Sequence, residues 1–170
     1  EEALSSGWLV HGLYGTADCR APEDWEAERV STKDMSRMST LKAPPGILAV
    51  MGMPEEGDTE PDVEDPAAFA LAIDGLSDPG NLGTIIRTAD WFGVSGIWIS
   101  HGSVDPFNPK VVQATMGAIF RLPIWSVDLP VTLHKLSAQG VSIQGLELAG
   151  ESLWEREKRT PPAARVAVVG

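Results

Sequence analysis

The chain of 170 residues is 43% hydrophobic, has a formal net charge of -11 and contains a single cysteine. This length allows one domain with an apolar core, or one domain with a smaller appendage. No apolar run is long enough to span a membrane, and no basic start followed by an apolar core suggests a signal peptide, so we expect a cytoplasmic protein. Cys19 has neither a disulfide partner nor the neighbouring ligands of a zinc site, so we expect no bound metal.

The negative charge is concentrated in one short segment. Residues 54–66 contain seven acidic residues, three prolines and one valine, a composition too polar to bury a core, which predicts a linker. Residues 67–170, in contrast, carry nine acidic and eight basic residues. A nearly neutral body can hold a local basic site, so the overall acidity argues mildly against a nucleic-acid partner without excluding one.

Residues 1–53 show a strand, helix and strand pattern that is small for an independent domain. The start of the chain looks like the end of a helix, and Ser31 is the predicted N-cap of a second helix, with Asp34 completing an approximate capping box. The predicted elements of this part are a helix end at Glu1–Ser6, a strand at Trp8–Tyr14, a helix after Ser31 and a strand at Ile47–Met51. We therefore expect a small, partial α/β domain before the linker.

Residues 67–170 alternate more clearly between strands and helices. Asn108 followed by Pro109 is typical of a helix start, because the Asn side chain caps the helix and proline suits its first position. The predicted strands are 69–73, 97–100, 122–125, 141–146 and 165–169, and the predicted helices are 81–92, 109 to about 116, and 131–138. Such alternation predicts an α/β domain with a parallel sheet flanked by helices, whose ligands bind where strands end.

The run from Asp74 to Gly93, DGLSDPGNLGTIIRTADWFG, is the most informative part of the chain. It leaves a buried strand, turns, and enters a helix whose first turn carries Asn81 and whose second carries Arg87. By composition alone it could be a turn with a capping Asn and a surface Arg. The glycines are too far apart for a dinucleotide fingerprint, and no phosphate-loop lysine is present.

Other polar and aromatic residues have structural explanations. His11, His101 and His134 are scattered without the spacing of metal ligands or a nucleophile beside them. Three tryptophans fall in or beside predicted core elements, and we expect them to pack there: Trp91, Trp98 and Trp125.

The run from Asp74 to Gly93 resembles the first signature motif of SpoU-type RNA ribose methyltransferases, which belong to the SPOUT superfamily. The matching residues are Asn81, Gly83, Arg87, Ala89 and Gly93. A second family motif is similar to NPKVVQATMGAIFRLP at 108–123, with Gly117, Ala118 and Pro123 matching. Residues 30–50 also resemble the link from the family's ribosomal-protein-like RNA-binding domain. Two ordered motifs at the expected separation are far more specific than either alone.

This resemblance implies a SPOUT-like fold over 67–170 and a partial RNA-binding domain over 1–53. It implies a homodimer that uses S-adenosylmethionine to methylate a ribose 2′-OH of ribosomal or transfer RNA. Gly170 resembles the first glycine of the third family motif, and the sequence ends there. We therefore expect the segment that forms the family's trefoil knot, and lines the cofactor pocket, to be missing from these 170 residues.

The resemblance also assigns site residues. It implies that Arg87 and Asn81 act in catalysis. It places the cofactor against Gly145, Leu146 and Gly170, with Gly117 allowing close backbone approach. A guanidinium loses its proton only above about pH 12, so our hypothesis is that Arg87 grips a phosphate and stabilises charge on the ribose oxygen instead of acting as a base.

Two alternatives to a complete enzyme remain open from the sequence. The chain could be a non-catalytic RNA-binding or dimerisation module of the same fold, or an unrelated α/β ligand-binding domain. Asn81 could be a helix cap, and each candidate glycine could serve an ordinary turn.

Overall fold

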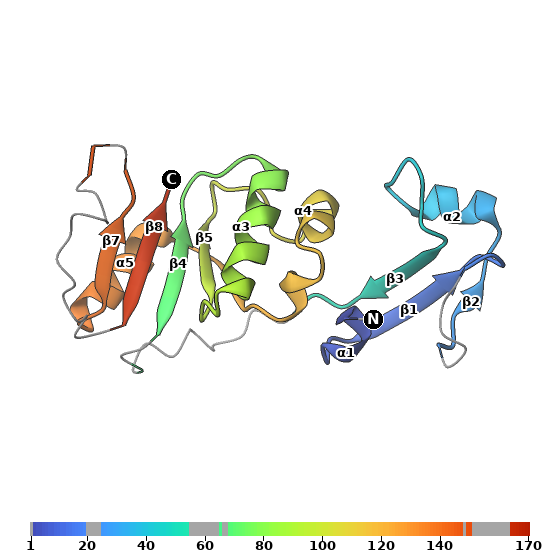
Figure 1. The fold of residues 1–170 in the computed structure, drawn as a ribbon, viewed down its shortest axis with the longest axis horizontal. Helices are drawn as coiled ribbons and strands as arrows, with labels where there is room; N and C mark the ends of the chain where they lie inside the picture. Colours follow the sequence, from blue (N-terminus) through green and yellow to red (C-terminus); the bar gives the residue numbers. More distant parts are fainter. Residues whose placement is uncertain (1, 20–24, 55–64, 66–67, 148, 151–163) are drawn as a thin grey trace. The chain divides into compact units, whose positions relative to one another are not determined.

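The computed structural model describes residues 2–19, 25–54, 65, 68–147, 149–150 and 164–170. The chain forms two compact units, Glu1–Glu55 and Glu56–Gly170 (Figure 1). The division falls within the segment predicted as an acidic linker, most of which lies outside the described residues.

The N-terminal unit contains a three-stranded sheet of order β2-β1-β3, in which β1 runs parallel to β2 and antiparallel to β3. Its elements are α1 Glu2–Ser5, β1 Val10–Gly15, β2 Glu28–Arg29, α2 Thr32–Met38 and β3 Ile47–Met51. Ser31 caps α2 as predicted, because its hydroxyl accepts a hydrogen bond from the Asp34 backbone N–H at 3.1 Å.

One strand of this unit starts later than the sequence predicts. We expected it at Trp8, but Gly7 adopts the left-handed conformation with φ of 81° and the Ser6 hydroxyl accepts from the Trp8 backbone N–H at 3.2 Å. This local turn occupies Trp8 and delays the strand to Val10. The short strand β2 was not predicted, because two residues are too few to show a period.

The C-terminal unit contains a five-stranded sheet of order β6-β5-β4-β8-β7, and all its strands are parallel. Its strands are β4 Phe69–Ile73, β5 Ile97–Ser100, β6 Ile124–Val127, β7 Ser142–Gly145 and β8 Arg165–Val169. Its helices are α3 Pro79–Trp91, α4 Pro109–Ala114, the 3-10 helix η1 Ala118–Phe120, and α5 Leu129–Ala138. The predicted α/β fold with a helix-flanked parallel sheet is confirmed.

Helices cover both faces of this sheet, as the two hydrophobic clusters show. Ile73, Ile97 and Ile99 pack with residues of α3 and α4 in one cluster. Their strand neighbours Ala72 and Trp98 pack with residues of α5 in the other. Successive residues of a strand point to opposite faces, so β4, β5 and β6 contribute to both clusters.

The bounds of α5 and α4 differ from the prediction. The difference arises from an overlooked capping residue in α5 and from left-handed backbone conformations after α4. Asp128 caps α5, which begins at Leu129, two residues before the predicted start. α4 ends at Ala114, because Met116 and Gly117 adopt left-handed conformations with φ of 52° and 91°. Strand β6 starts two residues later than predicted, because the Leu122 backbone N–H donates to the Ala118 carbonyl at 3.1 Å and Leu122 is held in the turn that ends η1.

Candidate active site at the carboxyl ends of the parallel strands

The parallel sheet brings the carboxyl ends of its five strands to one edge. The chain runs outward from β4 through β5 to β6, then crosses to β7 and returns inward to β8. The direction of winding therefore reverses between the adjacent strands β4 and β8. Ligands of open α/β sheets bind outside the strand ends at such a reversal.

The loop after β4 lies directly at this point. The Asp74 backbone N–H donates to the Val169 carbonyl of β8 at 2.8 Å, which ties the start of the loop to the end of the neighbouring strand. A Cβ added to Gly170 would meet the Asp74 carbonyl oxygen at 3.8 Å as one of its nearest neighbours. Gly170 and the loop that leads into α3 are thus adjacent, although 95 residues lie between Asp74 and Gly170 in the sequence.

The start of α3 is capped by Asp78, not by Asn81. The Asp78 carboxylate accepts a hydrogen bond from the Asn81 backbone N–H at 2.7 Å, and Pro79 occupies the first turn of the helix. The interpretation of Asn81 as the helix cap is therefore wrong. Its side chain is exposed beyond the cap, in the first turn of the helix at the strand ends.

Arg87 lies on the exposed side of α3. None of the ion pairs found among the described residues includes it. Six residues separate it from Asn81, an axial rise of about 9 Å. Helical side chains lean towards the helix N-terminus, which in α3 is the end at the strand termini, so an extended Arg87 side chain can reach in that direction.

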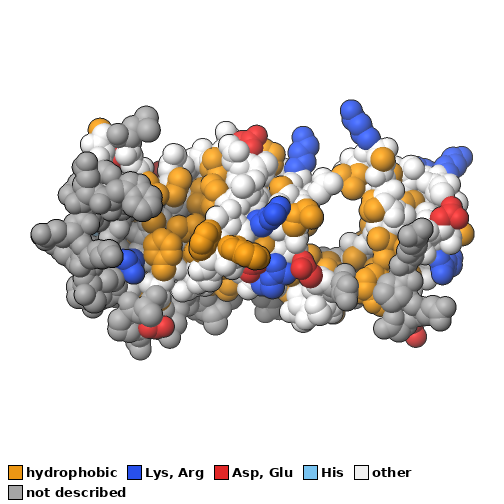
Figure 2. Space-filling view, viewed as in Figure 1, with side chains coloured by type: hydrophobic (Ala, Val, Ile, Leu, Met, Phe, Trp, Pro, Cys, Tyr) orange, Lys and Arg blue, Asp and Glu red, His pale blue; other side chains and the backbone are white. Residues whose placement is uncertain are grey.

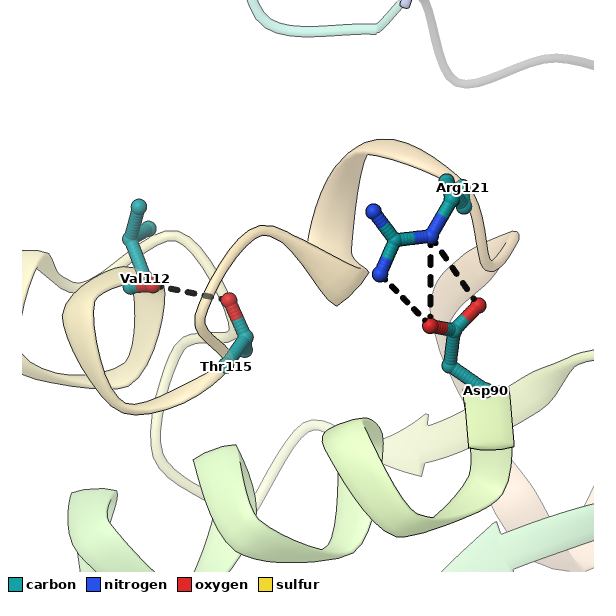
Figure 3. A network of polar contacts seen from close by, with 4 residues as sticks. All are labelled: Asp90, Val112, Thr115 and Arg121. Carbon is teal, nitrogen blue, oxygen red and sulfur yellow. Dashed lines mark hydrogen bonds and ion pairs between the residues drawn. The ribbon is translucent and has the colours of Figure 1, made fainter. Parts of the chain in front are cut away.

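The two predicted motifs pack against each other through α3 and α4. A Cβ on Gly83 would overlap the Ala114 side chain and meet the Val111 carbonyl oxygen at 3.0 Å, so only glycine allows this approach. At the far end of α3, the Arg121 guanidinium binds the Asp90 carboxylate with donor–acceptor distances of 2.7 and 3.2 Å (Figure 3). Between these points the buried Thr115 hydroxyl donates to the Val112 carbonyl at 2.7 Å (Figure 3).

The cofactor candidates fall into two groups. Gly145, Leu146 and Gly170 lie at the ends of the paired strands β7 and β8, and the Leu146 backbone N–H donates to the Val168 carbonyl at 2.9 Å. Gly117 lies elsewhere, in the turn between α4 and η1, where its left-handed backbone is required by the turn itself.

The end of β7 and β8 suits a nucleoside better than a charged ligand. Leu146 exposes 49% of its surface, and a Cβ on Gly145 would meet no described atom within 4 Å. Open backbone beside an exposed aliphatic side chain offers amide hydrogen bonds and an apolar surface for an aromatic ring. These residues fit the adenosyl part of S-adenosylmethionine.

The predicted packing of three tryptophans is confirmed for two of them and wrong for the third. Trp98 is 1% exposed and stacks at a tilt on Trp125, with ring centroids 6.1 Å apart, so these two pack as predicted. The prediction for Trp91 is wrong, because it is 85% exposed at the end of α3. Its place in or beside a predicted core element suggested packing, but it lies on the outer side of the helix. Figure 2 shows hydrophobic and basic side chains together at the surface over α3.

The described residues offer no second candidate site at the strand ends. A shallow surface hollow of about 490 Å³ lies in the N-terminal unit, lined by residues that include His11 and Trp25. No group of three or more His, Cys, Asp or Glu side chains in the described ranges could hold a metal ion. None of the described helices has the length and apolarity needed to cross a membrane.

The chain is similar to known proteins of one family. Residues 68–170, which are more than half of the chain, match the SpoU rRNA methylase family. The chain belongs to this family. It is 35% identical over 152 residues to the 23S rRNA (guanosine(2553)-2′-O)-methyltransferase RlmP of Bacillus subtilis, covering 87% of this chain and 59% of that protein. It is also 37% identical over 140 residues to the 23S rRNA (uridine(2479)-2′-O)-methyltransferase of Streptomyces viridochromogenes, covering 75% of this chain and 48% of that protein.

Solved SpoU-type structures share the fold. A TrmH-family protein from Porphyromonas gingivalis superposes with a TM-score of 0.77 at 36% identity, over 98% of this chain and 68% of the other. The AdoMet-bound rRNA methyltransferase of Sinorhizobium meliloti gives a TM-score of 0.80 at 27% identity, over 99% and 66%. The chain thus spans about half to two thirds of the length of its SpoU relatives. The predicted family membership is confirmed.

Sequence reasoning missed three residues of this edge. Asp78 carried a usable signal, because Asp followed by proline is the same helix start that was recognised at Asn108. Ser100 and Ser103, which bind the loop after β4, carried none. A serine at a strand end is common, and only the neighbouring strand shows what its hydroxyl binds.

Proposed function

We propose that this SpoU protein is a S-adenosylmethionine-dependent RNA methyltransferase that transfers a methyl group to a ribose 2′-OH of ribosomal RNA. Its family supports this, as do relatives named for ribose methylation and an AdoMet-bound neighbour of the same fold. The observation that carries the proposal is the position of the first motif. Its helix starts at the reversal of the sheet and carries an exposed arginine without an acidic partner among the described ion pairs.

S-adenosylmethionine, when bound, supplies a methyl group on a sulfonium. The chain must then hold the ribose hydroxyl in line with that methyl and stabilise the charge that develops as its proton leaves to solvent. We assign this task to Arg87. Its guanidinium can bind the phosphate next to the target ribose with two parallel hydrogen bonds and face the ribose oxygen at the same time.

The other candidate residues take supporting roles in this proposal. Asn81, whose side chain is free of capping, donates to the ribose or phosphate at the start of the helix. Gly145, Leu146 and Gly170 receive the adenosyl part of the cofactor. Gly117 shapes the turn that leads from α4 to η1, and its close approach to the cofactor stays a prediction.

We also propose that the protein is a homodimer. Support comes from the end of α3, where Trp91 and Phe92 expose 85% and 76% of their surfaces. Aromatic side chains this exposed are unusual on a monomer and typical of the core of an interface. Trp91 lies one turn from Arg87, so a second copy bound there would lie against the proposed site.

The proposal also covers the role of the N-terminal unit and the cellular location of the protein. We assign residues 1–53 to RNA binding and expect the protein to act in the cytoplasm. Exposed basic side chains on this unit, among them Arg29, Lys33 and Lys42, support contact with phosphates.

The decisive experiment measures methyl transfer directly. The 170-residue chain and the complete protein encoded by its gene are incubated with tritiated S-adenosylmethionine and unmodified ribosomal RNA. We expect label in RNA as 2′-O-methylnucleotide. Binding of RNA without any transfer by the complete protein would overturn the proposal in favour of a non-catalytic module, and label on a base would overturn the assigned chemistry.

A further inference from the structure

Two serine hydroxyls meet at the end of β5, beside the loop that follows β4. Ser100 is the last residue of β5 and only 8% exposed, and Ser103 lies half-buried in the next turn. Their hydroxyl oxygens are 3.1 Å apart, which is a hydrogen bond in which either one can donate. Neither serine belongs to the motif residues assigned above.

Each hydroxyl also accepts one backbone N–H from the loop after β4. The Gly75 N–H donates to Ser100 at 3.0 Å, and the Leu76 N–H donates to Ser103 at 3.2 Å. Gly75 has a φ of 66°, a left-handed conformation that turns these successive N–H groups towards β5. The Val104 N–H donates in return to the Leu76 carbonyl at 2.8 Å. The loop after β4 and the turn after β5 are therefore joined by hydrogen bonds donated in both directions.

The same loop is tied on its other side to β8, through the Asp74 N–H and the Val169 carbonyl. Its last residue, Asp78, caps α3. The loop thus leads from β4 to the helix that carries Arg87 and is hydrogen-bonded to the end of β8, next to Gly170. If the two serine hydroxyls are removed, two partly buried N–H groups lose their acceptors, and the loop can keep them satisfied only by moving towards water.

We propose that Ser100 and Ser103 form a positioning pair for methyl transfer. This inference rests on the proposed function. The two hydroxyls hold the 74–78 loop in place, so that the side chains of α3 face the end of β8 where the cofactor is proposed to bind. The pair touches neither substrate nor cofactor. It acts through the loop, and a small displacement of a positioned group is sufficient to slow a reaction.

The first test examines the loop without requiring activity. Amide hydrogen exchange, read by NMR, is compared in the wild type, Ser100→Ala and Ser103→Ala. We expect faster exchange at Gly75 in Ser100→Ala and at Leu76 in Ser103→Ala. The matched control is Ser126→Ala, an exposed serine of the neighbouring strand β6, which should leave both amides unchanged. Unchanged protection in the two loop variants would overturn the proposal.

The second test separates positioning from simple stability. In the complete protein, Ser103→Ala should lower kcat roughly ten- to hundredfold, while the Kd for S-adenosylmethionine and the melting temperature stay near the wild-type values. Ser103→Thr, which keeps the hydroxyl, should restore kcat. An unchanged kcat would overturn the proposal, as would a parallel fall of kcat and melting temperature that threonine does not rescue. A wild-type protein without transferase activity would instead overturn the proposed function, and the exchange experiment would still decide whether the serines hold the loop.

Discussion

The two sides of helix α3 obey different constraints. Its inner side consists of buried residues that pack on the sheet and on α4, namely Leu82, Gly83, Ile86 and Ala89. Its outer side carries polar side chains near the strand ends and an exposed tryptophan at the far end. Replacing the inner residues costs packing energy, whereas nothing in the described unit requires the identity of the outer ones. We therefore expect substitutions on the outer side to change function more than stability.

The contrast between the two sides of α3 predicts the largest loss of methyl-transfer activity at Arg87, on the outer side. Arg87→Ala should lower kcat about 10²- to 10³-fold, the cost of removing one preorganised charge-stabilising group, with no change in the free energy of unfolding because the side chain is exposed. Arg87→Lys should recover little, since lysine cannot bind a phosphate through two parallel bonds. Methyl transfer and denaturant unfolding are measured on the same samples. The control is Lys135→Ala on α5, across the sheet, and full activity of Arg87→Ala would end the assignment.

The inner side should respond in the opposite way. Gly83→Ala places a methyl group against Ala114 and the backbone of α4, at a steric cost of up to about 3 kcal/mol. The higher helix propensity of alanine offsets about 1 kcal/mol of this cost, so the free energy of unfolding should fall by about 1–2 kcal/mol. Urea titration gives the value, and the exposed neighbour Thr84→Ala is the control, expected to change stability little. A variant as stable as the wild type would mean that α3 and α4 are less tightly packed than described.

The exposed end of α3 offers a test of the homodimer. Trp91→Lys should weaken self-association roughly tenfold by placing a charge in the apolar contact, while stability of the monomer is unaffected. Analytical ultracentrifugation over a concentration series measures the dissociation constant. Val131→Lys, which charges a 64% exposed valine on α5, is the matched control. Equal dissociation constants for both variants would exclude Trp91 from the interface.

The smallest change in free energy is expected for the ion pair that Asp90, at the border between the two sides of α3, forms with Arg121. The Asp90–Arg121 pair is bidentate, but Arg121 is 46% exposed, so solvent screens the charges. A double-mutant cycle with Asp90→Asn and Arg121→Ala should give a coupling free energy of about 0.2–1 kcal/mol that declines with added salt. Coupling well above this range would mean that the pair has a larger structural role than its exposure suggests.

Local sequence patterns predicted most individual elements of the C-terminal unit. The strands 69–73, 97–100 and 165–169 were predicted at their observed bounds, because short apolar runs between turn residues indicate buried strands directly. The cap at Asn108 was recognised for the same reason, since its hydrogen bond to the Lys110 N–H involves only neighbouring residues. The start of α3 was predicted wrongly, because Asp78, the residue that caps this helix, was overlooked in favour of the nearby Asn81.

The sequence alone determined the family, the order of strands and helices along the chain, and the helix that carries Asn81 and Arg87, because these depend on neighbours in the chain. Only the tertiary structure decided that β8 lies beside β4, that Gly170 is adjacent to Asp74, that Ser100 and Ser103 bind the loop before α3, and that Trp91 faces outward. Strand order and burial depend on which distant segments pair and which faces become covered. No local period encodes those contacts.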